Sequence, residues 1–146
     1  MKSIFLAFTC LLVAANSLLA QSLPFTPKPQ VAVAVFSDGK PINQQTGIKA
    51  DAKGIRFKAL LNTSSNDFYS DFKPEVLIKN TEAVFVRNGR QVAQLTVTDK
   101  ELPTAFFQNA QPEDHIVFKL TLVAQRKNGE FIPLPEQPIY NFTIRK

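Results

Sequence analysis

Residues 82–97 read EAVFVRNGRQVAQLTV, two runs of strand-forming residues joined by Asn88-Gly89. An Asn-Gly pair between such runs is the strongest short-range signal of a β-hairpin, because a type I′ turn needs positive φ at both central residues. A two-residue loop sets Arg87 opposite Arg90, and directly opposed residues share one face of a sheet. We therefore expect an antiparallel hairpin. Its predicted core face holds Val84, Val86, Ala93, Leu95 and Val97, and its other face holds Ala83, Phe85, Val92, Gln94 and Thr96.

Similar quartets, SDGK at 37–40 and KNGE at 127–130, mark two more turns. Several runs on either side of them alternate apolar and polar residues, which is the pattern of a half-buried strand. The predicted strands include 31–36 (VAVAVF), 55–61 (IRFKALL), 115–124 (HIVFKLTLVA) and 139–146 (IYNFTIRK). In the clearest of them, one face carries Ile116, Phe118, Leu120, Leu122 and Ala124.

Three stretches have weaker patterns. The return segment after 127–130 holds Pro133 and Pro135, which cannot donate to a ladder, so we expect it at a sheet edge. Residues 99–114 are expected to hold one short strand or helical turn around 105–107. Residues 41–54 are polar and predict a loop.

Short strands with regularly spaced turns predict an all-β fold, an antiparallel immunoglobulin-like β-sandwich of seven to eight strands.

The first twenty residues predict a secretory signal peptide. Lys2 is followed by an apolar run from Ile4 to Ala15, and Ala20 stands before a polar stretch. The run is too short for a stable membrane span. We expect cleavage after Ala20, a Pro-rich lead-in over 21–30 and a single sandwich domain over 31–146.

The predicted export narrows the function classes. The only cysteine, Cys10, lies inside the leader, so the mature chain holds no disulfide and its fold depends on burial alone. About 126 residues bury enough surface for one such domain.

Basic residues are scattered, and removal of Lys2 leaves 16 basic and 12 acidic residues, a net charge of +4. Because nucleic-acid binders cluster their cations, no nucleic-acid partner is expected.

Chemistry-bearing motifs are scarce. His115 is the only histidine, and neither a metal-ligand cluster nor a glycine-rich phosphate loop accompanies it. We therefore expect no cofactor, no metal and no catalytic residue. QPED at 111–114 predicts a type I turn with Pro112 at its second position.

Aromatic residues suggest two places for contact with a partner. Phe68, Tyr69 and Phe72 lie in the polar loop NDFYSDF, where they are contact anchors or a satellite cluster folded over the sandwich end. Phe85 and Val92 lie on the predicted outer face of the 82–97 hairpin, where they form a binding patch or are covered by the 62–74 loop.

Half of the chain carries a family-like pattern. It consists of EAVFVRNGRQVAQLTV, LPTAFFQNAQPEDHIVFKLTLVAQRKNGEFIPL and the closing IYNFTI. With these features, residues 74–146 resemble the C-terminal immunoglobulin-like domains of the gliding-motility protein GldM of Bacteroidota. Family members usually have Gly where this chain has Glu113, and they are much longer, with an inner-membrane helix and several periplasmic domains. The resemblance implies an immunoglobulin-like fold and a cell-envelope setting, and it implies no catalytic residues.

These observations lead to one expected function and one alternative. The expected function is an exported, non-catalytic β-sandwich interaction module, periplasmic or secreted in a Gram-negative envelope, with a protein partner and an association with gliding or protein-export machinery. Self-association into a homo-oligomer is a second partner expectation. The alternative is a secreted small-molecule or glycan-binding protein. An unguarded edge strand would favour the interaction module, an enclosed apolar pocket would favour the binder, and a cleft joining His115 to a hydroxyl and a carboxylate would favour an enzyme.

Overall fold

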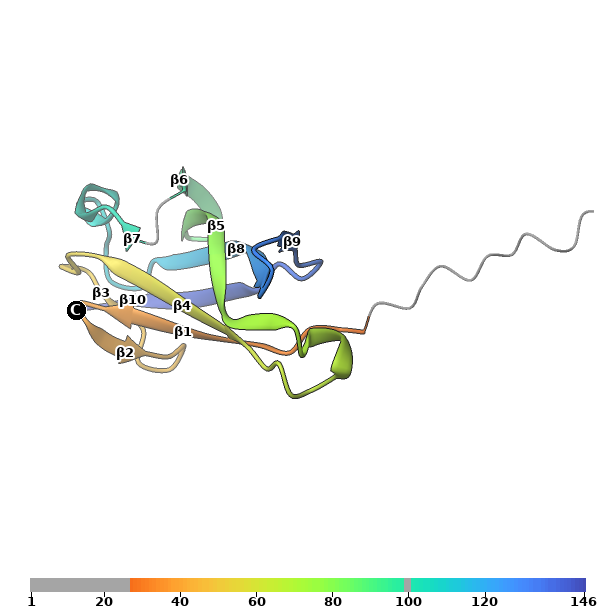
Figure 1. Cartoon of the computed structure of the whole chain (residues 1–146). Helices are drawn as coiled ribbons and strands as arrows, with labels where there is room; N and C mark the ends of the chain where they lie inside the picture. The colour runs from red at the N-terminus through yellow and green to blue at the C-terminus, as the bar shows by residue number, and fades with distance from the viewer. Residues whose placement is uncertain (1–26, 99–100) are drawn as a thin grey trace, which may run out of the picture.

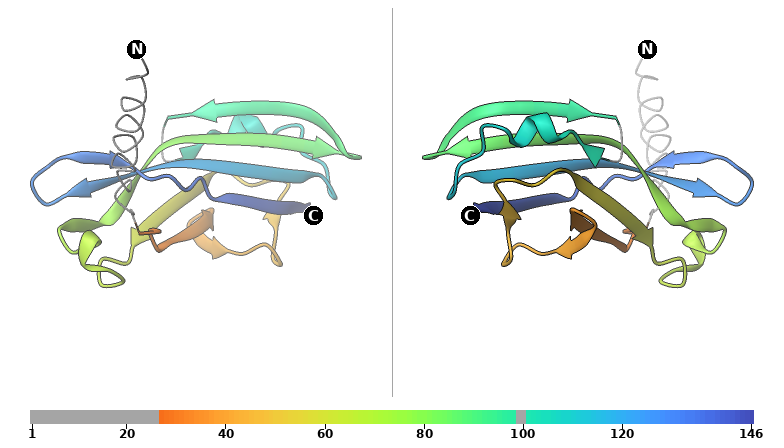
Figure 2. Two further views of the ribbon diagram at one scale, coloured as in Figure 1. Left: turned by 90° about the vertical axis from the view of Figure 1, so that its right-hand side faces the viewer. Right: turned by 90° about the vertical axis from the view of Figure 1, so that its left-hand side faces the viewer.

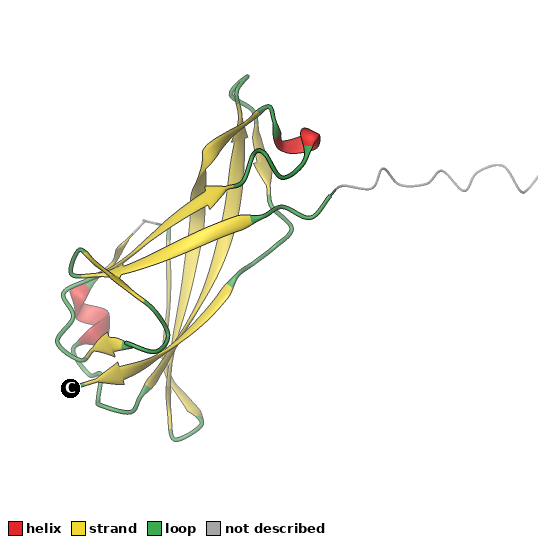
Figure 3. Cartoon of the chain, turned by 90° about the horizontal axis from the view of Figure 1, so that it is seen from below, coloured by secondary structure: helices red, strands yellow, loops and turns green. Residues whose placement is uncertain are grey.

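The structure, a computed structural model, describes residues 27–98 and 101–146, with the backbone alone at residue 101. The predicted signal peptide and residues 21–26 of the lead-in lie outside these residues. Strands dominate the described chain (Figure 3). The elements are β1 (Val31–Ser37), β2 (Lys40–Ile42), β3 (Ile48–Lys49), β4 (Ile55–Leu61), the 3₁₀ helix η1 (Asp67–Tyr69), β5 (Phe72–Arg87), β6 (Arg90–Val97), β7 (Glu101–Leu102), the 3₁₀ helix η2 (Thr104–Phe107), β8 (His115–Arg126), β9 (Phe131–Pro133) and β10 (Ile139–Arg145).

All ten of these strands belong to one sheet. Its main order is β2-β1-β4-β5-β8-β10-β3, with β6 beside β5, β7 beside β4 and β9 beside β8 (Figure 1). Neighbouring strands are antiparallel except β10 and β3, which pair in parallel. The all-β, sandwich-like fold predicted from the sequence is confirmed. The strand count exceeds the predicted seven to eight because β2, β3 and β7 are short pairings outside the predicted strands.

The long strand β5 joins the two layers of the sandwich. The first part of β5 pairs with β4 through Ala59↔Val76, whereas its last part pairs with β6. The register of β5 against β8 shifts between Ile78 and Asn80, at the boundary between these two parts. A β-bulge bends its strand and increases the local twist. The irregularity therefore lets one strand serve both layers, and the sandwich is a single curved sheet.

The core lies between the layers and is built mainly by β4, β5, β8 and β10. The five residues predicted for one face of β8, from Ile116 to Ala124, are fully buried, so this prediction is confirmed. Phe118 packs edge-on against Phe57 of β4 at 5.1 Å between ring centroids, and against Phe142 of β10 at 5.9 Å. Rings from three strands thus meet across the interior without a tryptophan or a disulfide among the described residues.

The hairpin turns divide into two kinds. Asn88 and Gly89 have φ of 51° and 73°, and Asp38 and Gly39 have φ of 51° and 77°, which confirms the type I′ turn predicted at the first pair. At 127–130 only Gly129 has positive φ, and its N–H donates to the carbonyl of Arg126 at 2.9 Å. This turn is a three-residue loop with a glycine in the left-handed region. It leads into β9, which has β8 as its one neighbour among the described strands and is the Pro-containing edge segment expected from the sequence.

Candidate interaction edge

Strand β6 is the outermost strand on its side of the sheet. It pairs with β5 from Arg87↔Arg90 to Thr81↔Val97, and no other described strand pairs with it. Both views in Figure 2 draw β6 as the last ribbon at this edge. A strand edge without a neighbour presents a row of backbone N–H and C=O groups that another strand can pair with. This eight-residue edge is therefore the first candidate for contact with a partner.

A β-bulge near the hairpin tip changes the predicted faces. Arg87 lies opposite Arg90 as predicted, but the register shifts between Phe85 and Val86, so that Phe85 pairs with Ala93. Val92 is the extra residue of the bulged strand, and no alternation pattern in the sequence signals it. A shift of one residue moves a whole set of side chains to the opposite face. The predicted assignment is therefore right for one strand of the hairpin and wrong for the other.

The correction concerns β5. Ala83 and Phe85 face the core and are buried, whereas Val84 and Val86, predicted for the core face, lie half-buried on the other side. On β6 the predicted set of Ala93, Leu95 and Val97 does share the inner face, because its members pair with Phe85, Ala83 and Thr81. At the sheet edge this inner face is only partly covered: Ala93 is exposed, and Leu95 and Val97 are half-buried.

The outer face of β6 is polar and hydrogen-bonded within the hairpin. The amide of Gln94 donates to a carboxylate oxygen of Glu82 on β5 at 2.7 Å, and Gln91 donates to Gln94 at 2.9 Å. Residues 91–97 contain no charged side chain and no proline. Natural edge strands are protected from unwanted pairing by lysine, proline or bulges. Here the bulge at Val92 protects only the beginning of the strand, so residues 93–97 form an unguarded edge.

Two of the five predicted contact residues are exposed. Val92 is 52 % exposed at the bulge of β6, and Phe68 is 42 % exposed in η1. Phe85 is 3 % exposed, because η2 covers it: its ring lies 4.8 Å from Phe106 and 6.0 Å from Phe107. The prediction that Phe85 contributes to a surface patch is therefore wrong. Its cover comes from residues 104–107, and the 62–74 loop lies elsewhere.

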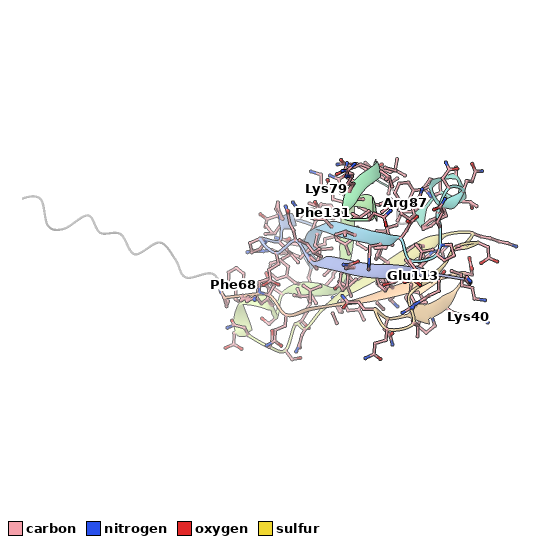
Figure 4. The ribbon with its side chains drawn as sticks, turned by 180° about the vertical axis from the view of Figure 1, so that it is seen from behind. Lys40, Phe68, Lys79, Arg87, Glu113 and Phe131 are labelled. Atoms are coloured by element: carbon pink, nitrogen blue, oxygen red, sulfur yellow. The ribbon has the colours of Figure 1, made fainter. Side chains whose placement is uncertain are left out.

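The aromatic loop folds inward at the opposite end of the molecule. Tyr69 and Phe72 are 2 % and 1 % exposed, so they are part of the core and cannot anchor a partner. The Tyr69 hydroxyl donates to the carbonyl of Pro27, and the guanidinium of Arg126 lies 5.2 Å from the centre of the Phe72 ring. Of the two alternatives that the sequence left open, the loop is thus the satellite cluster folded over the sandwich end. Its hydrogen bond to Pro27 fixes the segment that precedes β1. Phe68 lies at its rim (Figure 4).

Arg87, which the hairpin register places at a solvated tip, forms an ion pair instead. Its Nε and Nη2 donate to the two carboxylate oxygens of Asp114 at 2.8 Å each, and Nη2 also donates to the carbonyl of Asn109. Asp114 is 3 % exposed. The hydrogen bonds from Arg87 lower the pKa of Asp114, against burial, which raises it. This pair attaches the tip of the β5–β6 hairpin to the segment before β8.

The turn that carries Asp114 differs from the predicted type. The N–H of Asp114 donates to the carbonyl of Gln111 at 3.1 Å, and Glu113 has a φ of 75°. Positive φ at the third position defines a type II turn, where glycine is favoured. The predicted type I turn is therefore wrong, although Pro112 occupies its expected second position. Glu113 is held in this conformation because its N–H donates to the carbonyl of Ile144 at 3.0 Å.

His115 begins β8 and is exposed. Its cross-strand neighbours are Val86 on β5 and Thr143 on β10. The adjacent carboxylate of Asp114 is engaged by Arg87 and by the N–H of Gln111. A hydrolytic triad needs a carboxylate that orients the imidazole toward a nucleophile. The described geometry assigns this carboxylate to a structural ion pair.

A surface groove of about 680 Å³ lies along β1 and β4. Its lining combines the half-buried ring of Phe36 with the exposed cations Lys53, Arg56 and Lys58. The lining also includes Asp38, whose carboxylate accepts a hydrogen bond from the backbone N–H of Lys53 at 2.9 Å. The groove is open and cationic, which differs from the enclosed apolar pocket expected of a small-molecule binder.

Within residues 27–98 and 101–146, no three acidic, histidine or cysteine side chains gather where they could hold a metal ion. None of the helices described there has the length and apolar character needed to cross a membrane.

Comparison of the chain with protein-family models, with curated proteins and with solved structures gives no match. The resemblance of residues 74–146 to the gliding-motility family therefore stays a prediction. The functional reading depends on the geometry of the described residues.

The sequence pattern missed the residues that now matter most. Ala93, Leu95 and Val97 read as core because they alternate with polar residues, and alternation reports a face without telling a central strand from an edge strand. The central strand β8 alternates in the same way, with Lys119 and Thr121 between its buried residues, so the sequence offered no signal that β6 lies at an edge.

Proposed function

We propose that this protein is an exported, non-catalytic β-sandwich interaction module that binds a protein partner in the cell envelope through the edge of β6. The observation that carries the proposal is the unguarded edge at residues 93–97, which pair with β5 on one side and with no described strand on the other. Strand addition at such an edge supplies main-chain hydrogen bonds, and half-exposed side chains beside it supply specificity.

The side chains at the edge support this mode of binding. Leu95 and Val97 are half-buried on the inner face, and Ala93 is exposed there, so an added strand would cover apolar surface that β6 leaves open. The gain is both apolar burial and backbone pairing. The Arg87–Asp114 ion pair helps to hold the hairpin in place for an incoming strand.

The cellular setting in this proposal comes from the sequence. The signal peptide predicted at residues 1–20 and the cysteine-free remainder support a periplasmic or secreted protein of a Gram-negative envelope. The resemblance of residues 74–146 to the gliding-motility family supports an association with gliding or protein-export machinery. The alternative, a small-molecule or glycan binder, would use the groove at Phe36, whose open cationic lining suits it less well than an enclosed site would.

A capture experiment with matched charge variants tests the proposal. The bait is the exported chain, and the source of partners is its native envelope fraction. Ala93→Lys places a lysine on the inner face of the edge, the device by which natural edge strands prevent pairing. Ala93 is exposed, so the substitution leaves the core intact. The control, Gln45→Lys, adds the same charge to an exposed turn away from β6.

We expect the wild type and Gln45→Lys to capture the same envelope proteins and Ala93→Lys to lose most of them, by at least tenfold. Equal capture by both lysine variants would show that binding occurs elsewhere on the molecule. No specific capture by the wild type at any salt concentration would contradict the interaction module itself.

A further inference from the structure

The edge of β6 has a sequence that is complementary to itself. Residues 93–97 read AQLTV, with apolar side chains at 93, 95 and 97 and polar side chains at 94 and 96. An antiparallel partner strand that continues the sheet must oppose apolar to apolar and polar to polar, because directly opposed residues share a face. A second copy of the same strand satisfies this rule when one residue of the segment pairs with the same residue of the other copy.

Resting on the proposed function, we infer that the partner at this edge is a second copy of the chain, paired antiparallel with β6 and centred on Leu95. In this register Leu95 faces Leu95 of the other copy, Ala93 faces Val97, and Gln94 faces Thr96. The apolar residues on the inner faces of the two sheets then form one continuous surface, and the polar residues on the outer faces form another. Such a contact is isologous and closes as a two-fold dimer.

The bulge at Val92 selects this register. Two neighbouring registers also keep the faces matched. One is centred on Gln94 and would require Val97 to pair with Gln91, beyond the bulge, where the ladder is irregular. The other is centred on Thr96 and would move the pairing to Thr98, which lies beyond the end of β6. The Leu95 register uses all five regular residues and none of the irregular ones.

Charge does not oppose the pairing. The only charged residue of β6 is Arg90, at its first position and outside the paired segment. Among the acidic side chains that the structure describes, Glu82 lies beside this edge, on β5 opposite Thr96. Its counterpart in the second copy would be three strand spacings away, roughly 14 Å. At physiological salt the screening length is about 8 Å, so the repulsion between the two carboxylates is weak.

The expected dimer is weak. Five paired residues cover much less than the roughly 800 Å² per partner of a standard interface. We therefore expect self-association that depends on concentration and that a covalent link can capture. The test uses the full chain with Cys10→Ala, so that an introduced cysteine is the only thiol.

Single-cysteine variants read the register directly. In the Leu95 register, Leu95→Cys places two thiols opposite each other, with Cα atoms about 4.5–5.5 Å apart and within disulfide reach. Ala93→Cys alone, or Val97→Cys alone, places the two equivalent thiols four residues apart along the strands, roughly 13 Å, which is beyond reach. A mixture of the Ala93→Cys and Val97→Cys proteins brings unlike thiols together.

Under mild oxidation we expect Leu95→Cys to form a covalent dimer, each of the other two variants to remain at least tenfold less linked, and their mixture to form a mixed dimer. The mixture is an independent readout should Leu95→Cys fold poorly. Equal cross-linking of all three single variants, or none in Leu95→Cys and in the mixture, would overturn the inference. If cross-linking fails while Ala93→Lys still abolishes envelope capture, the interaction module stands and its partner is a different protein.

Discussion

Thr81 provides the sharpest test of the packing between the two layers. It lies in β5 with no exposed surface, pairs with Val97 on one side and Leu120 on the other, and its hydroxyl has no hydrogen-bond partner among the described residues. A buried hydroxyl without a partner costs about 1–3 kcal/mol, because it has lost its bonds to water and gained none. Thr81→Val replaces this hydroxyl by a methyl group in the same branched shape.

We expect Thr81→Val to raise the free energy of unfolding by about 1 kcal/mol, at the low end of that cost because valine repacks the site imperfectly. For a domain of this size, such a gain raises the Tm by roughly 3–6 °C. Thr81→Ser is the matched control, because it keeps the hydroxyl and removes the methyl group. It should lower the free energy of unfolding by about 1 kcal/mol.

Urea denaturation of the three proteins, followed by circular dichroism, measures both changes. A valine variant less stable than the wild type would refute the reasoning, because it would mean that the hydroxyl is bonded. A serine variant as stable as the wild type would mean that the methyl group is not packed. Unchanged m-values across the series would show that the comparison concerns the folded state.

Two further predictions concern the turn before β8. Glu113→Gly should stabilise the protein by about 0.5–1 kcal/mol, because a residue with a side chain is strained at a φ of 75°. The control Glu113→Ala keeps the Cβ and should leave the stability nearly unchanged. Thermal unfolding measures the difference, and equal effects of the two substitutions would exclude backbone strain as the cause. Arg87 lowers the pKa of Asp114 in the folded state, so the stabilisation from this carboxylate is complete above its unfolded pKa of about 3.9 and is lost as the pH falls through the lower folded value. Between pH 7 and pH 2 the wild type should therefore lose more stability than Asp114→Asn, as measured by denaturation midpoints, and parallel losses would contradict this role for the pair.

Local patterns predicted most of the strands and two of the turns. The alternation from Ile116 to Ala124 set one face of β8 against the core, because side chains of a strand alternate and only one side of this strand is uniformly apolar. Asn88-Gly89 predicted its type I′ turn because few residues adopt positive φ at two successive positions. These features depend on neighbours in the chain, and the sequence displays them directly.

The candidate site was less predictable. Phe85 reads as an outer-face residue only when the hairpin is assumed to be regular, and the bulge at Val92 is a property of the ladder that no nearby residue announces. Tyr69 and Phe72 in a polar loop are compatible with a contact surface or with a folded cluster, and the choice follows from the approach of Pro27 and Arg126, which are distant in sequence. Arg87 likewise finds its partner at Asp114, which is distant in sequence and lies just before the neighbouring strand β8.

The sequence by itself determined the all-β class, the positions of the main strands and the reliance on apolar burial without a disulfide in residues 21–146, because periodicity, turn chemistry and cysteine content are local or countable. Only the tertiary structure decided that β5 serves both layers, that the hairpin contains a bulge, and that β6 is left at an edge. The physical reason is that a strand's neighbours are chosen by the burial of the whole chain. The same alternating sequence fits the middle of a sheet or its rim.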